Sequence, residues 1–145
     1  VRHLCALGVP LACVTNGERA VVEANLEVLG IRGCFQVVVA NGDYAAGKPA
    51  PDPYLCACER LGKEPGLCVA VEDSPIGAQA ALSAGLFTVV WPEESGERGA
   101  PEASWSGPVP HHIIQEDRFP WEILNLASSQ DPQGCDAAAS AVGGS

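Results

Sequence analysis

Apolar and polar residues alternate along the first ninety residues in short blocks that predict strands and helices in turn. Compact apolar runs are typical of strands buried on both faces, and they lie at 10–16, 36–40, 68–72 and 87–91. Between these runs apolar residues recur at helical spacing, each time followed by a glycine, over 18–29, 52–61 and 75–84. Residues 1–7 have the pattern of a helix end before Gly8, and Asp52 is the expected cap of the helix over 52–61. This alternation predicts parallel β/α units in a three-layer, Rossmann-like α/β fold.

The regular pattern ends after the fourth predicted strand. Residues 92–110 are rich in proline, glycine and acidic residues, and they predict a surface loop. A short edge strand is predicted over 111–115 and a short helix over 120–127. Bulky apolar residues are almost absent after residue 127. We therefore expect one core domain over 1–126 and a disordered tail over 127–145.

The composition excludes several classes of protein. The 145 residues carry a formal net charge of −10 without a cluster of lysine or arginine, which argues against binding to nucleic acid. No apolar stretch is long enough to span a membrane. The chain has no methionine, even at position 1, and its start lacks the pattern of a signal peptide. We therefore expect that a segment upstream of residue 1 is missing.

Seven cysteines could indicate a disulfide scaffold, but their positions argue against it. Their number is odd, there is no C-x-x-C pair, and four of them fall inside predicted strands or helices: Cys13, Cys56, Cys58 and Cys68. This distribution predicts reduced thiols that pack as small apolar side chains in an intracellular protein, cytoplasmic or within an organelle. The three histidines share no ligand spacing with them, which argues against zinc.

Polar residues follow three of the predicted strands. Thr15 and Asn16 end the first strand, and Lys48 lies in the loop after the second. Glu72 and Asp73 end the third strand. Ligands of parallel α/β sheets bind outside the carboxyl ends of the strands, so we expect these residues to surround one pocket.

The residues after the first two strands have the chemistry of a phosphate site. Thr15 offers a hydroxyl, and the amides of Asn16 and Gly17 stand at the start of a predicted helix, where anions bind. Lys48 offers a positive charge. Taken alone, Thr-Asn-Gly is more often a turn with a helix cap, and a lysine in a proline-rich loop is more often solvated.

The acidic pair adds the chemistry of a metal site. Glu72 and Asp73 are like charges side by side, and either a cation or an exposed loop would explain them. Carboxylate oxygens suit Mg²⁺, which binds one or two of them together with phosphate oxygens and water. A phosphate site, a lysine and a Mg²⁺ site together favour phosphoryl chemistry.

Three segments then carry a resemblance to the haloacid dehalogenase superfamily, in its branch of β-phosphoglucomutase-like proteins and sugar-phosphate phosphatases. They are ACVTNG, GKPAPDPYL and VAVEDSPIGAQAALSAG, in that order. The resemblance implies that Thr15, with help from Asn16, binds the transferred phosphoryl group. It implies that Lys48 steadies the negative charge, and that Glu72 and Asp73 hold Mg²⁺.

One motif of that superfamily is absent. The resemblance extends over about 4–91. The first motif of the superfamily is Asp-x-Asp, which carries the nucleophile and the general acid/base, and the 145 residues contain no such motif. In the superfamily this motif ends the central strand and a cap domain follows it. We therefore expect an incomplete core domain that lacks its central first strand, its nucleophile and its cap.

The expected function is that of a Mg²⁺-dependent phosphatase acting on a small phosphorylated metabolite through an aspartyl-phosphate intermediate. Two alternatives stay open, a phosphomutase that uses the same groups and a non-catalytic binding or regulatory domain. The chain alone is expected to be inactive. An upstream segment or a second chain is the expected source of the Asp-x-Asp motif, and we expect neither nucleic acid nor a membrane as partner.

Overall fold

A computed structural model describes residues 1–91 and 107–114 of the chain. The predicted loop over 92–110 is thus covered only at its end. The predicted helix over 120–127 and the predicted disordered tail over 127–145 lie outside the described residues.

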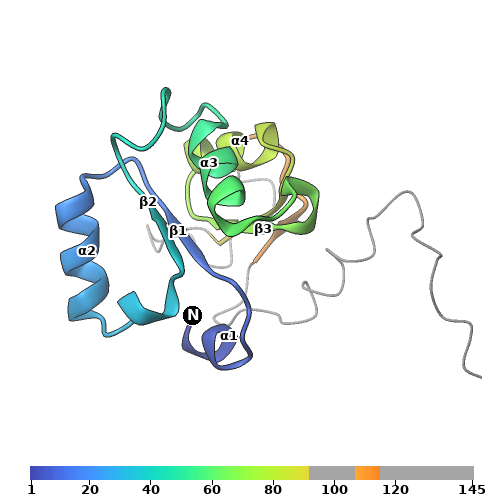
Figure 1. Ribbon diagram of the computed structural model, residues 1–145. Coiled ribbons are helices and arrows are strands. Elements are labelled where there is room, and N and C mark those ends of the chain that lie inside the picture. Colours follow the sequence, from blue (N-terminus) through green and yellow to red (C-terminus); the bar gives the residue numbers. More distant parts are fainter. Residues whose placement is uncertain (92–106, 115–145) are drawn as a thin grey trace, which may run out of the picture.

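Helices and strands alternate as the sequence pattern predicts (Figure 1). In chain order they are α1 (Arg2–Ala6), β1 (Ala12–Val14), α2 (Arg19–Val28), β2 (Val37–Val39), α3 (Asp52–Leu61), β3 (Val69–Glu72), α4 (Pro75–Ser83), β4 (Phe87–Val90) and β5 (His112–Ile113). Two short 3₁₀ helices complete the described chain, η1 (Arg32–Cys34) and η2 (Pro65–Leu67). No helix in the described parts of the chain is long and apolar enough to cross a membrane.

All described strand pairs are parallel, but they form two sheets. β1 pairs with β2, and β3, β4 and β5 pair in that order. Within the described residues β1 and β3 therefore each have an edge without a ladder partner, although Val14 of β1 packs against the core cluster that includes Ala70 of β3. The parallel α/β fold is confirmed, and the division of the sheet is consistent with an incomplete core domain.

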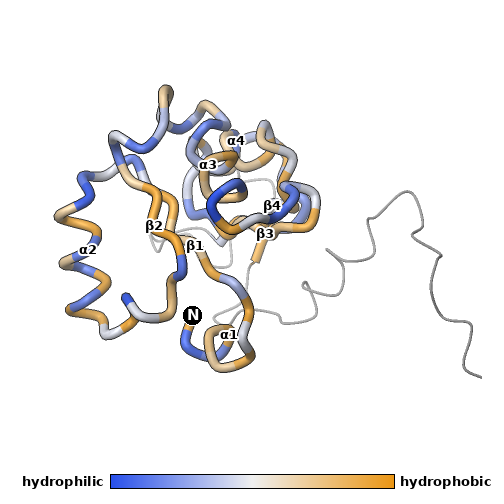
Figure 2. Tube along the Cα trace, in the orientation of Figure 1, coloured by the Kyte–Doolittle hydropathy of each residue, from blue (hydrophilic) through white to orange (hydrophobic). Residues whose placement is uncertain are grey.

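Helices pack against both sheets. Figure 1 shows α2 on one side of β1 and β2, with α3 and α4 together on the other. α3 contacts both strands of the first sheet, α4 contacts β3 and β4, and the two helices contact each other. Strands are mostly apolar and helices mixed, as Figure 2 shows, which is typical of strands in a parallel α/β sheet. The main core cluster contains mostly small side chains. It consists of Tyr54, Cys58, Ala70, Ala80, Ala81, Ala84 and Leu86.

The start of α3 differs from the prediction. Asp52 does not cap the helix but is its first residue, and Pro51 stands at the N-cap position. The reason is that the Pro51 carbonyl already accepts hydrogen bonds from the amides of Tyr54 and Leu55, at 3.0 and 3.1 Å. The first turn therefore begins one residue earlier than the sequence suggests.

The cap of α4 leads to a first prediction. The Ser74 hydroxyl accepts a hydrogen bond from the Gly77 amide at 3.2 Å and so satisfies one donor at the helix start. Replacing Ser74 with alanine is expected to lower the free energy of unfolding by about 1 kcal/mol in urea titrations. The matched control is Ser83→Ala at the other end of α4, where the exposed hydroxyl bonds only the Gln79 side chain among the residues that the structure describes. An equal loss in both variants would contradict the capping role.

Candidate functional site

The Lys48 side chain joins the carboxyl ends of β1 and β3. Its ammonium donates a 3.0 Å hydrogen bond to the Val14 carbonyl at the end of β1, and it forms an ion pair with the Glu72 carboxylate at the end of β3. It also lies 3.4 Å from the Tyr54 hydroxyl. Only 12% of the Lys48 side chain and 7% of the Glu72 side chain are exposed. The charge is therefore held inside the molecule, between the two sheets.

The loop that carries Lys48 is fastened to the end of β1 by Asn16. The Asn16 amide group donates to the Lys48 carbonyl at 3.1 Å, and its oxygen accepts from the Lys48 amide at 2.9 Å. The Tyr44 hydroxyl donates to the Thr15 carbonyl at 3.0 Å and lies 3.2 Å from the Asn16 oxygen. Gly47 leaves room for this arrangement, since a Cβ there would lie 2.9 Å from that oxygen. Asn16 therefore holds the Lys48 loop in place through hydrogen bonds, in addition to its predicted role with phosphate.

Thr15 and Gly17 form a tight turn directly after β1. The Gly17 amide donates to the Thr15 hydroxyl at 3.0 Å, and the Thr15 amide continues the ladder by donating to the Val39 carbonyl at 3.0 Å. Thr15 is half-buried, whereas Asn16 and Gly17 are exposed. Because the Thr15 hydroxyl accepts from Gly17, its own proton can be donated to a bound anion.

The two predicted metal ligands differ in their surroundings. Glu72 is buried and accepts hydrogen bonds from both Lys48 and Tyr54. Burial is the main cause that raises the pKa of Tyr54, and the neighbouring Glu72 carboxylate raises it further, so the phenol remains a donor. Asp73 is exposed. The adjacent carboxylates therefore face different environments, one engaged with a lysine and one accessible to solvent.

The acidic pair fits a Mg²⁺ site that has few protein ligands. Within the described residues, no group of three or more histidine, cysteine, aspartate or glutamate side chains is arranged so that it could hold a metal ion. Mg²⁺ does not require such a cage, because it commonly binds one or two carboxylates and completes its shell with phosphate oxygens and water. Asp73, exposed at the strand end, has the right chemistry for a direct ligand.

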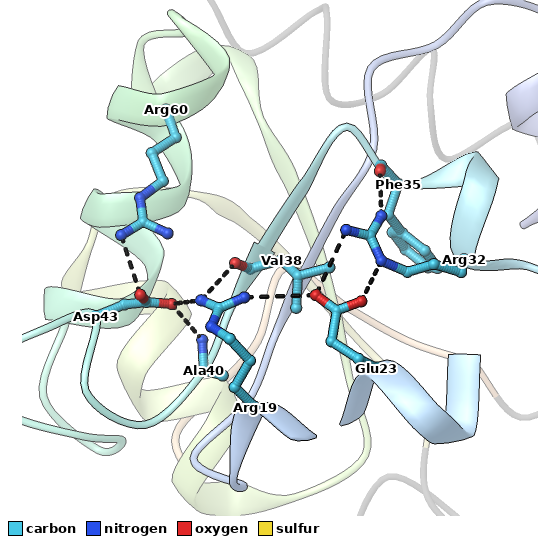
Figure 3. Close-up of polar contacts among 8 residues, drawn as sticks. All are labelled: Arg19, Glu23, Arg32, Phe35, Val38, Ala40, Asp43 and Arg60. Atoms are coloured by element: carbon cyan, nitrogen blue, oxygen red, sulfur yellow. Dashed lines mark hydrogen bonds and ion pairs between the residues drawn. The ribbon is translucent and has the colours of Figure 1, made fainter. Parts of the chain in front are cut away.

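A network of ion pairs anchors the start of the same loop (Figure 3). Asp43 accepts a 2.8 Å hydrogen bond from the Ala40 amide at the end of β2, and it pairs with Arg19 of α2 and with Arg60 of α3. The Ala40 amide, followed by the two arginines, lowers the pKa of Asp43. The network continues through Glu23 to Arg32. Asp43 therefore connects the loop to the helices on both sides of the first sheet.

Three of these residues were not predicted from the sequence. Asp43 lacked the context of a catalytic aspartate, and nothing in the sequence pattern marks Tyr44, whose partners lie near residue 15. Tyr54 could have been found, because it falls on the apolar face of a predicted helix yet carries a hydroxyl, and a buried hydroxyl requires a partner. The structure brings Thr15, Lys48 and Glu72 to one edge, with Asp73 next in the chain.

Comparison with known proteins identifies the family. The family model for haloacid dehalogenase-like hydrolases matches residues 1–85, more than half of the chain. This chain belongs to the haloacid dehalogenase-like hydrolases. The resemblance drawn from the three sequence motifs is therefore confirmed.

Two of the following three relatives of this haloacid dehalogenase-like chain, YqaB and N-acylneuraminate-9-phosphatase, have names that state an activity. The chain is 44% identical over 80 residues to the fructose-1-phosphate phosphatase YqaB of Escherichia coli, a stretch that covers 55% of this chain and 43% of YqaB. It is 48% identical over 88 residues to protein CbbY of Cupriavidus necator, covering 59% and 35%. N-acylneuraminate-9-phosphatase of Rattus norvegicus is 36% identical over 107 residues, covering 73% and 42%.

Solved structures agree with this assignment. CbbY from Rhodobacter sphaeroides, crystallised in complex with phosphate, matches with a TM-score of 0.67 at 29% identity, covering 78% of this chain and 49% of that protein. β-Phosphoglucomutase from Clostridium difficile matches with a TM-score of 0.68 at 18% identity, covering 88% and 52%, which supports the fold alone. The chain thus spans about half or less of the length of each of these relatives.

Proposed function

We propose that this chain forms the phosphate-binding and metal-binding part of a Mg²⁺-dependent phosphatase that acts on a small phosphorylated metabolite. The observation that carries the proposal is the position of Lys48, whose ammonium stands between the end of β1 and the end of β3. A cation there lies next to the ends of the two strands that Thr15 and Asp73 directly follow. The relatives named above include phosphatases of phosphorylated sugars.

The proposed roles follow from the chemistry of each group. The Thr15 hydroxyl and the Asn16 amide would bind phosphate oxygens, because they follow β1 shortly before α2, whereas the Gly17 amide already donates to the Thr15 hydroxyl. Lys48 would neutralise charge on the phosphoryl group. Asp73 would hold Mg²⁺ directly, together with Glu72. Bound Mg²⁺ would supply further neutralisation of the phosphate charge.

The proposed nucleophile lies on a strand that the 145 residues do not contain. They include no Asp-x-Asp motif, and β1 and β3 each have an edge without a ladder partner within the described residues. We propose that a strand carrying this motif pairs with both edges and brings an aspartate to the phosphoryl group, forming an aspartyl phosphate. An upstream segment or a second chain would supply it.

The six described cysteines are all free thiols, which supports an intracellular protein.

The test is hydrolysis of p-nitrophenyl phosphate by the purified chain with Mg²⁺. We expect no turnover by the chain alone, because nothing in it is proposed to attack phosphorus. Addition of a peptide that carries an apolar strand ending in Asp-x-Asp should give turnover that EDTA abolishes, whereas the same peptide with asparagine in place of the first aspartate should not. Metal-dependent turnover by the chain alone would contradict the proposed location of the nucleophile.

A further inference from the structure

The third residue of α4 has no side chain, and the Glu72 carboxylate occupies the space where one would be. Gly77 is buried. A Cβ built on it would lie 2.7 Å from Oε1 of Glu72 and closer still to Oε2, distances that real Cβ atoms essentially never show. The atoms in conflict belong to a buried side chain with fixed partners, so they cannot move aside at low cost.

Local helix chemistry gives no reason for a glycine at this position. Ser74 caps α4 and Pro75 is its first residue. In a helix capped by serine, the third position is where a glutamate or glutamine can complete the capping box, and glycine is among the poorest helix formers. Here a carboxylate does lie over the first turn of the helix, but it comes from Glu72, before the helix, rather than from residue 77. A negative charge at a helix start is favourable.

The position of Glu72 also sets the position of Lys48. Oε1 of Glu72 is the shared acceptor of the Lys48 ammonium and the Tyr54 hydroxyl. The ammonium lies 5.0 Å from the centre of the Tyr54 ring, so all three side chains form one contact group. If the carboxylate were displaced by an atom at residue 77, the ammonium would lose its counter-ion.

We infer that Gly77 is a positioning residue: the missing side chain makes room for the Glu72 carboxylate, which in turn holds the Lys48 ammonium between β1 and β3. The effect on Lys48 follows from the contacts alone. Its consequence for phosphate binding rests on the proposed function.

The experiment compares Gly77→Ala in three backgrounds, namely wild type, Glu72→Gln and Glu72→Ala. Glutamine keeps the bulk of residue 72 and removes its charge, whereas alanine removes both. In the wild type and in the glutamine background, Gly77→Ala should raise the unfolding equilibrium constant about tenfold or more. In the alanine background the constant should be unchanged or should fall by up to about fivefold, because alanine is the better helix former.

Two further measurements separate positioning from simple packing. Nuclear Overhauser contacts between the Lys48 side chain and the Tyr54 ring are expected in the wild type and should be lost in Gly77→Ala. Titration with inorganic phosphate should show affinity weakened about threefold or more in that variant. If the wild type binds no phosphate, the proposed function fails, while the stability comparison and the Lys48 contacts still decide the role of Gly77.

Equal destabilisation in all three backgrounds would overturn the inference, since it would mean that residue 77 clashes with something other than Glu72. Unchanged contacts between Lys48 and Tyr54 in Gly77→Ala would also overturn it. Should Gly77→Ala fail to fold in the wild type, recovery of a folded chain in the Glu72→Ala background would support the inference, and failure there as well would overturn it.

Discussion

Replacing Lys48 with methionine is expected to lower the free energy of unfolding at pH 7 by about 3–5 kcal/mol, because the buried Glu72 carboxylate would lose its cation. The Val14 carbonyl would lose its lysine donor as well. Urea titration of the wild type and the variant measures the change. The matched control is Lys63→Met at an exposed lysine after α3, where we expect a change within about 0.5 kcal/mol.

The double variant Lys48→Met/Glu72→Gln tests the physical reason. Removing the charge from residue 72 removes the uncompensated carboxylate, so the double variant should recover most of the stability lost in Lys48→Met. An additive loss in the double variant would mean that Lys48 acts mainly through Val14 and Tyr54. The ion pair would then not be the interaction that holds the lysine.

Replacing Asp73 with asparagine is expected to reduce Mg²⁺-dependent hydrolysis about 100-fold or more in the chain supplemented with the Asp-x-Asp strand. The substitution keeps the size of an exposed side chain and removes the charge proposed to face the metal. Stability should change little, because no buried partner loses its counter-charge. The measurement is the initial rate of p-nitrophenyl phosphate hydrolysis over a range of Mg²⁺ concentrations.

Glu59→Gln serves as the control for Asp73→Asn. Glu59 is an exposed carboxylate on α3, so its replacement changes the net charge by the same amount away from the site. We expect the hydrolysis rate of this variant to stay within about twofold of the wild type. If Asp73→Asn retains the wild-type rate and Mg²⁺ dependence, Asp73 is not the metal ligand.

The order of elements and the strand-end position of the site could be predicted from the sequence. Uninterrupted apolar runs marked the buried strands, and residues such as Thr15 and Glu72 stand at the ends of those runs. Parallel strands all end at the same edge of a sheet, so local pattern and general topology together were enough. The missing central strand was inferred from the absent Asp-x-Asp, and it agrees with the division of the sheet in two.

Contacts between distant residues could not be predicted in this way. The sequence presents Glu72 and Asp73 as an equivalent pair, but burial depends on packing against α3 and α4, and it buries Glu72 against Tyr54 while Asp73 stays exposed. Asn16 contacts a loop 32 residues away, and Asp43 pairs with arginines from two helices. Such long-range hydrogen bonds leave no local pattern in the sequence, whereas the buried strands and the helices do.

We propose above that the ends of β1 and β3 and the loop with Lys48 form one phosphate site. The most direct measurement is titration of the ¹⁵N-labelled chain with inorganic phosphate and Mg²⁺, followed by amide chemical shifts. If they do, the amides of Gly17, Lys48 and Asp73 should show saturable changes. Changes centred instead on the ion-pair network at Arg19 and Arg60, or no saturable change at all, would contradict it.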